Sequence, residues 1–288
     1  MKKLYYIFAD WRKKDVAFLN TLNISNIIEE GIASFTVKEG KDYNKIIEYY
    51  SKKDFLFNKN KPKEFNISLA RVDFSKEDLD NAKYYAISFI PPYSTPSTRY
   101  PQPNKNGEYI QQVFDGDFYN LYDYNYVNRK KQIAPFKIKK PKWKKNEICF
   151  NLGLEAEYTC FKKEFYQEVL APLGLKSMEV LDYKTGKPLE DTIQLIIPTA
   201  KSKLLLENFA YDILPKEESR GYKQYAVQTL DFFPPFEKDF DFHICYSQEY
   251  FGGGLQRIIV SKEFCNLLIK HNIIEYSTHH LTPASARL

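Results

Sequence analysis

Two residues with complementary chemical roles, His243 and Cys245, lie two positions apart in the last fifth of the chain. On an extended strand alternate residues share a face, so the imidazole could take the proton of the thiol and create a nucleophile. Such a pair needs a third group that orients the imidazole, and no residue at a recognisable spacing supplies one. Small buried side chains on a core strand are therefore the better interpretation of this pattern.

Two other patterns contain residue types that bind metals. Asp115 and Asp117 flank a glycine, and His279 directly precedes His280. An Asp-Gly step between aromatic runs is more typical of a hairpin turn, and neighbouring residues of a strand point to opposite faces. Further ligands are missing from both patterns. We therefore expect no metal and no cofactor.

The glycine run 252–254 could bind an anion through its backbone N–H groups. The helix that would complete a phosphate site does not follow directly, because a strand-like run comes first. We interpret the glycines as a turn or a close backbone crossing. A contribution of this region, with Tyr250 and Phe251, to an interface is the second interpretation.

No complete catalytic set is visible in the sequence. Motifs of nucleotide-binding loops, zinc proteases and serine hydrolases are absent from it. We therefore expect a protein that is not an enzyme. An enzyme whose site is assembled from scattered residues is an open alternative, with Asp115, Asp117, His243 and His279 as its candidates.

The elements that would position these residues are short and of both kinds. Apolar residues recur at helical spacing in some segments and alternate with polar ones in others. We expect an α+β fold with one or two small mixed or antiparallel sheets flanked by short helices. The pattern predicts helices over 42–50, 75–82, 161–170, 201–211 and 262–271, and strands over 4–8, 65–74, 83–90, 178–183, 192–197, 222–230, 239–247, 256–260 and 275–281.

The chain is expected to divide in two near its middle. Residues 1–145 would form an N-terminal α+β region that contains a loop with five prolines at 91–107, and residues 146–288 a C-terminal α+β region, unless both make one continuous domain. Two Lys-Glu-Phe runs, at 163–165 and 262–264, each open a predicted helix that leads into a strand. They indicate a duplicated helix-then-strand unit.

The composition is that of a globular chain. Its 288 residues are 43% hydrophobic and 27% charged, which suffices for a real core. The 23 Tyr and 22 Phe belong mostly to that core, with a minority available for contacts. The four cysteines form no CxxC pair and indicate buried thiols in a reducing compartment. Because we find neither a signal peptide nor an apolar run of about 18 residues, we expect a cytoplasmic protein.

The net charge of +5 is concentrated in one segment. Residues 1–150 contain 27 Lys and Arg against 18 Asp and Glu, whereas residues 151–288 contain 15 against 19. Residues 129–145, which we call the basic strip, contain nine basic and no acidic residues. The strip could bind an acidic protein, or it could contact phosphates while Phe136 and Trp143 stack on bases. A strand or linker with lysines on its solvated side is the structural interpretation.

The second half has an order of residues that resembles a bacterial protein family. Residues 249–255 (EYFGGGL) precede 258–261 (IIVS), a short amphipathic helix and a closing strand, and the runs 174–180 (GLKSMEV) and 183–187 (YKTGK) form a similar unit. This order resembles immunity proteins of polymorphic-toxin and type VI secretion systems, which neutralise toxins delivered between competing cells. The chain departs from that family in two ways, since it lacks paired CxxC metal sites and has a basic strip where many immunity proteins are acidic.

The resemblance implies a non-enzymatic cytoplasmic immunity protein that binds and neutralises a cognate toxin. Aromatic anchors and a charged rim would form its interface. A nucleic-acid-binding protein that uses the basic strip is the alternative, and it predicts an affinity that falls steeply with salt. The expected partner-binding residues are Arg129, Lys130, Lys131, Lys139, Lys140, Trp143, Lys144, Lys145, Tyr250 and Phe251.

Overall fold

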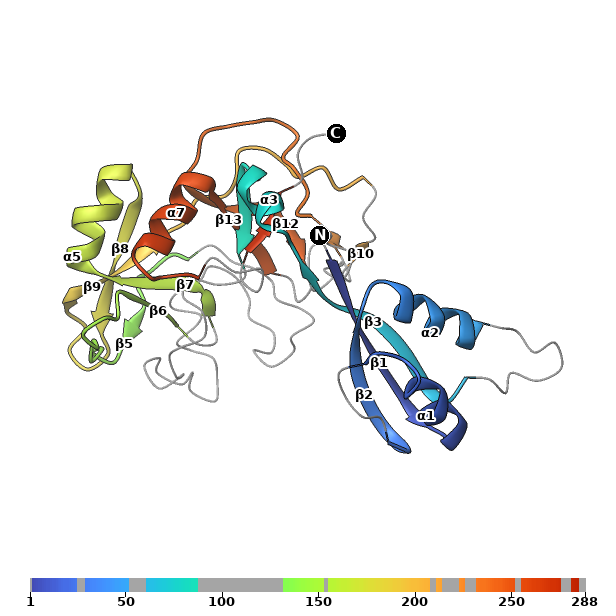
Figure 1. The fold of residues 1–288 in the computed structure, drawn as a ribbon. Coiled ribbons are helices and arrows are strands. Elements are labelled where there is room, and N and C mark those ends of the chain that lie inside the picture. Colours follow the sequence, from blue (N-terminus) through green and yellow to red (C-terminus); the bar gives the residue numbers. More distant parts are fainter. Residues whose placement is uncertain are drawn as a thin grey trace. The chain divides into compact units, whose positions relative to one another are not determined.

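The fold is α+β and rich in strands, as the sequence predicts (Figure 1). It comes from a computed structural model, in which the chain forms two compact units, Met1–Asn81 and Ala82–Leu288. The residues described are 2–24, 29–51, 61–87, 132–152, 155–207, 211–213, 223–225, 232–251, 255–275 and 281–284.

The first unit is a three-stranded antiparallel sheet with its first two helices packed on one face (Figure 1). Alternate residues of its central strand, Ile7, Ala9 and Trp11, are buried in that helix-covered core, as the period of a strand requires. The strands lie in the order β2-β1-β3, and the elements are β1 (Lys2–Trp11), α1 (Lys13–Leu19), β2 (Gly31–Lys38), α2 (Lys41–Ser51), β3 (Lys63–Asp73) and α3 (Lys76–Asn81).

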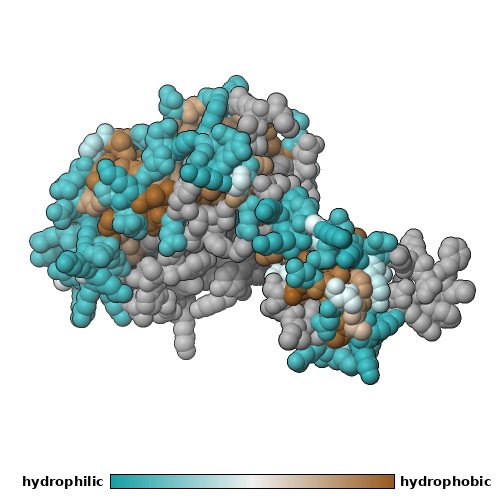
Figure 2. All heavy atoms as spheres, in the orientation of Figure 1, coloured by the Kyte–Doolittle hydropathy of each residue, from teal (hydrophilic) through white to brown (hydrophobic). Residues whose placement is uncertain are grey.

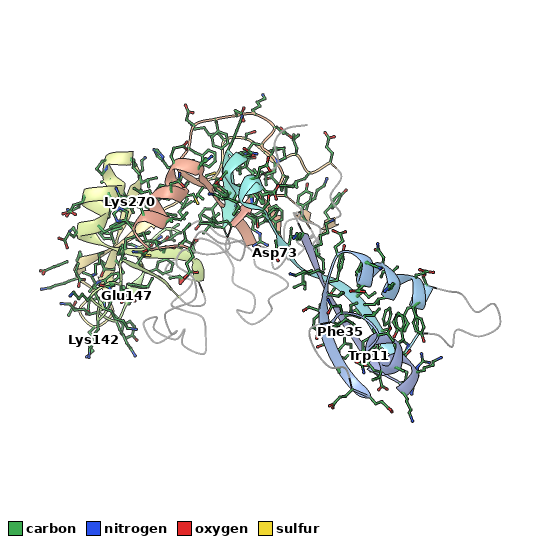
Figure 3. The ribbon with its side chains drawn as sticks, in the orientation of Figure 1. Trp11, Phe35, Asp73, Lys142, Glu147 and Lys270 are labelled. Carbon is green, nitrogen blue, oxygen red and sulfur yellow. The ribbon has the colours of Figure 1, made fainter. Side chains whose placement is uncertain are left out.

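Trp11 is the centre of this core (Figure 3). The centroid of its ring lies 5.6 Å from that of Phe35 and 6.2 Å from those of Tyr50 and Phe65. Its indole N–H donates to the carbonyl of Ala33 at 2.9 Å. The largest side chain of the unit therefore buries its apolar surface and satisfies its polar atom within the same sheet.

A buried carboxylate fixes the start of α1. The Asp15 side chain is fully buried, and Arg12 donates to it from Nε at 2.6 Å and from a terminal guanidinium nitrogen at 3.1 Å. The Arg12 backbone N–H also donates to this carboxylate, at 3.1 Å, and closes the first helical turn. Hydrogen bonding to Asp15 raises the pKa of Arg12, so the guanidinium stays charged beside the buried anion.

The hydroxyl of Tyr50 is buried close to this ion pair. It forms no hydrogen bond of good geometry with the described residues, although it lies near enough to the Asp15 carboxylate for a weak one and for its charge to act on the phenol. Burial, reinforced by the negative charge of Asp15, raises the pKa of Tyr50. The phenol is thus an unpaired polar group in the most aromatic part of the unit.

The second unit contains two sheets. The first has the strand order β10-β11-β12-β13-β4-β14, and Phe233, Phe236 and Phe251 are buried in its core. The helix α7 (Lys262–Lys270) begins at Ser261, whose hydroxyl accepts from the N–H of Phe264 at 3.1 Å. The strands are β4 (Tyr84–Ile87), β10 (Tyr211–Ile213), β11 (Lys223–Tyr225), β12 (Ile244–Phe251), β13 (Leu255–Ser261) and β14 (Leu281–Pro283).

The other sheet has five strands in the order β5-β8-β9-β7-β6. The helical run that follows β7 begins as an α-helix, continues as a π-helix and ends at Gly174, whose φ of 74° is the left-handed conformation that terminates helices. The elements are β5 (Lys137–Ile138), β6 (Cys149–Leu152), β7 (Glu155–Lys162), α5 (Lys163–Phe165), η1 (Tyr166–Leu170), η2 (Ala171–Leu173), β8 (Lys176–Asp182) and β9 (Pro188–Ile196).

The two Lys-Glu-Phe runs occupy equivalent places in these two sheets. Each follows the second strand of an antiparallel hairpin, β6–β7 or β12–β13, and opens a helix. In both sheets the strand after the helix lies two places away, with one strand between that is antiparallel to both neighbours. Both hairpin–helix–strand segments are therefore split β-α-β crossovers. Their helices meet where the Phe165 ring contacts the His271 ring, at 5.0 Å between centroids.

One predicted helix is wrong. Residues 201–207 form no helix, because the leucines there alternate, with Leu204 and Leu206 buried and Leu205 39% exposed. Their backbone bonds to a neighbouring segment instead, as in the 2.8 Å bond from the Leu205 N–H to the carbonyl of Pro235. An apolar run of this length fits either period, and the tertiary pairing selected the extended one.

Other boundaries also differ from the sequence prediction. The helix α1 and strand β2 were not predicted, and the strand expected at 239–247 begins only at Ile244. The compact units divide at Asn81, whereas a boundary was expected at residue 145. Residues 137–138 pair with β8, so the end of the expected N-terminal region lies in a sheet of the second unit.

None of the described helices is long and apolar enough to cross a membrane.

The Tyr50→Phe substitution should leave the unfolding free energy unchanged or raise it by about 1 kcal/mol, because it removes an unpaired buried hydroxyl and keeps the ring. It should also weaken the loss of stability at high pH. Above the ordinary tyrosine pKa of 10.0 the unfolded chain releases the Tyr50 proton while the folded chain retains it, so stability falls as pH rises. Urea unfolding at several pH values measures both effects. Tyr6→Phe, at a 40% exposed position, is the matched control, and a large destabilisation by Tyr50→Phe would contradict the absence of a partner.

Candidate functional site

The described part of the basic strip connects the two edges of the five-stranded sheet. It leaves the edge strand β5 at Ile138 and enters the opposite edge strand β6 at Cys149. The connection lies on the face that contains Phe136, Phe150, Cys160 and Val180, because Trp143 packs against this cluster. The inner side of the segment is therefore part of a core.

Trp143 anchors the crossing. Its ring packs on Phe150, with 5.0 Å between centroids, and Pro141 beside it is buried. The ammonium group of Lys162 lies 5.6 Å from the centre of the Trp143 ring and donates to the carbonyl of Lys144 at 3.4 Å. The tryptophan therefore has a ring on one side and a cation near the other.

Lysines alternate with these inward residues. Lys140, Lys142 and Lys144, which we call the lysine row, are exposed, whereas the intervening Pro141 is buried and Trp143 half-buried. This alternation is that of an extended chain, in which every second residue recurs after about 7 Å. The three lysine side chains are therefore exposed, whereas Pro141 and Trp143 between them face the core.

The lysine row has no counter-charge of its own. Neither its members nor the exposed Lys139 and Lys145 form an ion pair with any residue that the structure describes. The acidic residue nearest in sequence, Glu147, accepts from the backbone N–H of Lys144 at 3.1 Å and so braces the turn at the end of the strip. Figure 3 shows Lys142 and Glu147 at this end of the sheet, and Figure 2 shows a hydrophilic surface there.

The start of the strip is fixed by an amide pair. The side chains of Gln132 and Gln194 exchange hydrogen bonds at 2.9 and 2.6 Å. Gln194 lies on β9, the central strand, and is 2% exposed. The backbone carbonyls of Phe136 and Ile138 then accept from the N–H groups of Leu181 on β8 and of Tyr183 just after it, each at 2.8 Å. The strip is therefore held at both ends by polar contacts that its sequence does not reveal.

The predicted partner-binding residues are in different situations. Lys139, Lys140, Lys144 and Lys145 are exposed together, and Trp143 supports them from below. Arg129, Lys130, Lys131 and the loop 91–107 lie outside the described residues. Lys142, which was left out of the predicted set, is exposed in the middle of the lysine row, and its alternation with Pro141 and Trp143 was the signal that could have included it.

The two aromatic residues predicted near the glycine run are not equivalent. Tyr250 is half-buried on β12, whereas Phe251 is fully buried in the core of the first sheet of its unit. The Phe251 ring contacts Phe233 and Tyr225, with centroids at 6.1 and 6.2 Å. We therefore place Phe251 in the core and not on a contact surface.

The thiol and imidazole considered as a nucleophilic pair do not work together. Cys245 is 1% exposed, and burial alone raises its pKa to about 12, so the thiol stays protonated near neutral pH. His243 precedes the strand, and its ring lies beside Phe264 at 6.2 Å between centroids. Asp115, Asp117, His279 and His280 lie outside the described residues. Among the described residues no three His, Cys, Asp or Glu side chains gather as a metal site.

Comparison of the chain with protein-family models, with curated proteins and with solved structures finds no match.

The Trp143→Ala substitution should lower the unfolding free energy by about 2–4 kcal/mol, because it removes the anchor between the strip and Phe150. It should also release the lysine row from its fixed arrangement. Lys142→Ala, one residue away and exposed, is the matched control and should change stability by less than about 0.5 kcal/mol. Chemical unfolding compares the two variants, and equal effects would mean that Trp143 is no anchor.

The four thiols should resist a disulfide exchange reagent at pH 8 while the chain is folded. All four are buried, and burial raises the pKa of Cys265, like that of Cys245, to about 12. Since only thiolates react, labelling should follow unfolding. A colorimetric thiol titration with and without denaturant checks this, and rapid labelling of the folded chain would contradict the burial.

Proposed function

We propose that this chain is a non-enzymatic binding protein whose lysine row engages an acidic protein surface, and that its partner is a cognate bacterial toxin. The observation that carries the proposal is the unpaired lysine row on an anchored segment. The immunity class is supported by the sequence resemblance at 174–187 and 249–261. Such a protein would act in the cytoplasm, where it would cover the toxin's functional surface.

Because its backbone is already fixed, the lysine row should lose less entropy when a partner binds. A free lysine loses much side-chain and backbone entropy when a partner fixes it. Here Pro141, Trp143 and the hydrogen bonds around β5 already fix the backbone. A preorganised row of like charges also raises the local potential and steers an anionic partner, which speeds association.

The surroundings of the aromatic side chains favour an acidic protein over a nucleic acid. Base stacking needs an accessible ring face, but Phe136 is fully buried and Trp143 packs on Phe150 with Lys162 near its ring. The strip therefore offers charge without stacking. A partner surface that carries several neighbouring carboxylates matches the charge of the lysine row.

The experiment captures partners of the tagged full-length chain from its source lysate at low and high salt, and then co-expresses the captured protein with and without the chain. We expect one stoichiometric protein partner whose growth inhibition is relieved by the chain. Nucleic acid that is lost at high salt, with no protein retained, would replace this function with the nucleic-acid alternative.

Reversal of the row, Lys140→Glu with Lys142→Glu and Lys144→Glu, should slow association with that partner by about tenfold at low salt. The difference should shrink as salt screens the charges. A matched control reverses Lys176, Lys201 and Lys270, which are exposed in the same unit and change the net charge equally. Surface plasmon resonance measures the rates, and equal slowing by both triple variants would show that only net charge matters.

A further inference from the structure

Among the described strands, β2 is an open edge of the sheet in the first unit. It is the outermost strand in the order β2-β1-β3, it runs for eight residues, and its pairing with β1 has no bulge. Natural edge strands are usually shortened, bulged or guarded by inward charges and prolines. Residues 31–38 (GIASFTVK) have none of these guards except Lys38 at the end.

The outward hydrogen-bonding groups of β2 can be assigned from its register. The N–H of Glu39 donates to the carbonyl of Lys3 at 2.7 Å, and hydrogen-bonded pairs alternate along an antiparallel ladder. Odd-numbered residues of β2 therefore bond to β1. Ile32, Ser34 and Thr36 direct their N–H and C=O groups away from the sheet, and their side chains are exposed, with Ile32 at 69%.

We propose that β2 pairs with β2 of a second copy of this chain, antiparallel and with Ser34 on a two-fold axis. In this register Ser34 lies opposite Ser34, and Ile32 opposite Thr36. Glu30, exposed at the bend directly before the strand, comes close to Lys38 in this register, and both pairs occur twice by symmetry. Each exposed acid therefore meets a base, and each exposed isoleucine is covered by a threonine.

Neighbouring registers lack this complementarity. A shift that centres the axis on Ala33 places Glu30 opposite Thr36, and one that centres it on Phe35 places Lys38 opposite Ile32. Neither Glu30 nor Lys38 forms an ion pair within the described part of one chain, so both charges are available. The pairing joins two three-stranded sheets into one six-stranded sheet and removes the open edge, which is how a two-fold interface is self-complementary. It uses no residue of the basic strip and is independent of the proposed function.

Charge exchange across the axis tests the pairing. Glu30→Lys and Lys38→Glu each place like charges opposite one another twice, so each single variant should raise the dissociation constant of the dimer by roughly three- to thirtyfold. The double variant restores opposite charges and should restore the wild-type constant. Sedimentation of the full-length chain from roughly 1 to 100 µM covers weak to moderate association.

A cross-link tests the axis itself. Two cysteines at position 34 would have Cα atoms about 5.5 Å apart in a hydrogen-bonded pair, which suits a disulfide. Ser34→Cys should therefore form a covalent dimer under mild oxidation, and the four native thiols are buried and should not interfere. Thr36→Cys is the matched control, because its copies would lie four residues apart along the strands, about 14 Å, and should not cross-link.

A chain that stays monomeric over this range, or single variants with no effect on the dimer, would overturn the proposal. Equal cross-linking at positions 34 and 36 would also overturn it, because it would show collisions and not a register. A monomer whose β2 is instead covered by an added extended peptide would reassign this edge to a different partner.

Discussion

The crossing of the five-stranded sheet by residues 139–148 is the constraint on which the candidate site depends. The strands that it joins, β5 and β6, lie at opposite edges, and the connection between them packs on one sheet face through Trp143. A segment in that position needs an apolar side toward Phe150 and a polar side toward water. Alternation of lysine with proline and tryptophan supplies both sides. The lysine row is thus a consequence of topology as well as of composition.

In the first unit a buried charge is accompanied by groups that compensate it. Asp15 is buried without exposed surface, and it is tolerated because Arg12 and a backbone N–H surround its carboxylate. The nearby Tyr50 hydroxyl lacks such compensation among the described residues and has a raised pKa. The lysine row avoids this cost because its side chains remain in water. Among the described residues, the lysine row leaves its charge unpaired on a surface that a partner could reach.

The two sheets of the second unit contain the same hairpin–helix–strand connection. A hairpin, a helix that starts with Lys-Glu-Phe and a strand two places away occur in both. The helix N-terminus is stabilised differently in each, since Ser261 caps α7 whereas Lys162 provides no side-chain cap to α5. The Lys-Glu-Phe runs therefore marked a topological repeat. The strand that lies between the hairpin and the strand after the helix comes from different places in the chain, β9 in one sheet and β4 in the other.

Local pattern in the sequence determined the fold class, the helix α7, the strands β1, β3, β8 and β9, and the basic strip as the place of concentrated charge, because periodicity and charge are properties of neighbouring residues. The tertiary structure decided what depends on distant pairing. It made 201–207 extended by bonding Leu205 to Pro235, buried Phe251, and turned Trp143 into a support instead of a stacking surface. The sequence could not reveal that β5 and β6 lie at opposite edges, since the strands between them follow later in the chain. The connection between these two edges packs Trp143 on the core and leaves the lysines exposed.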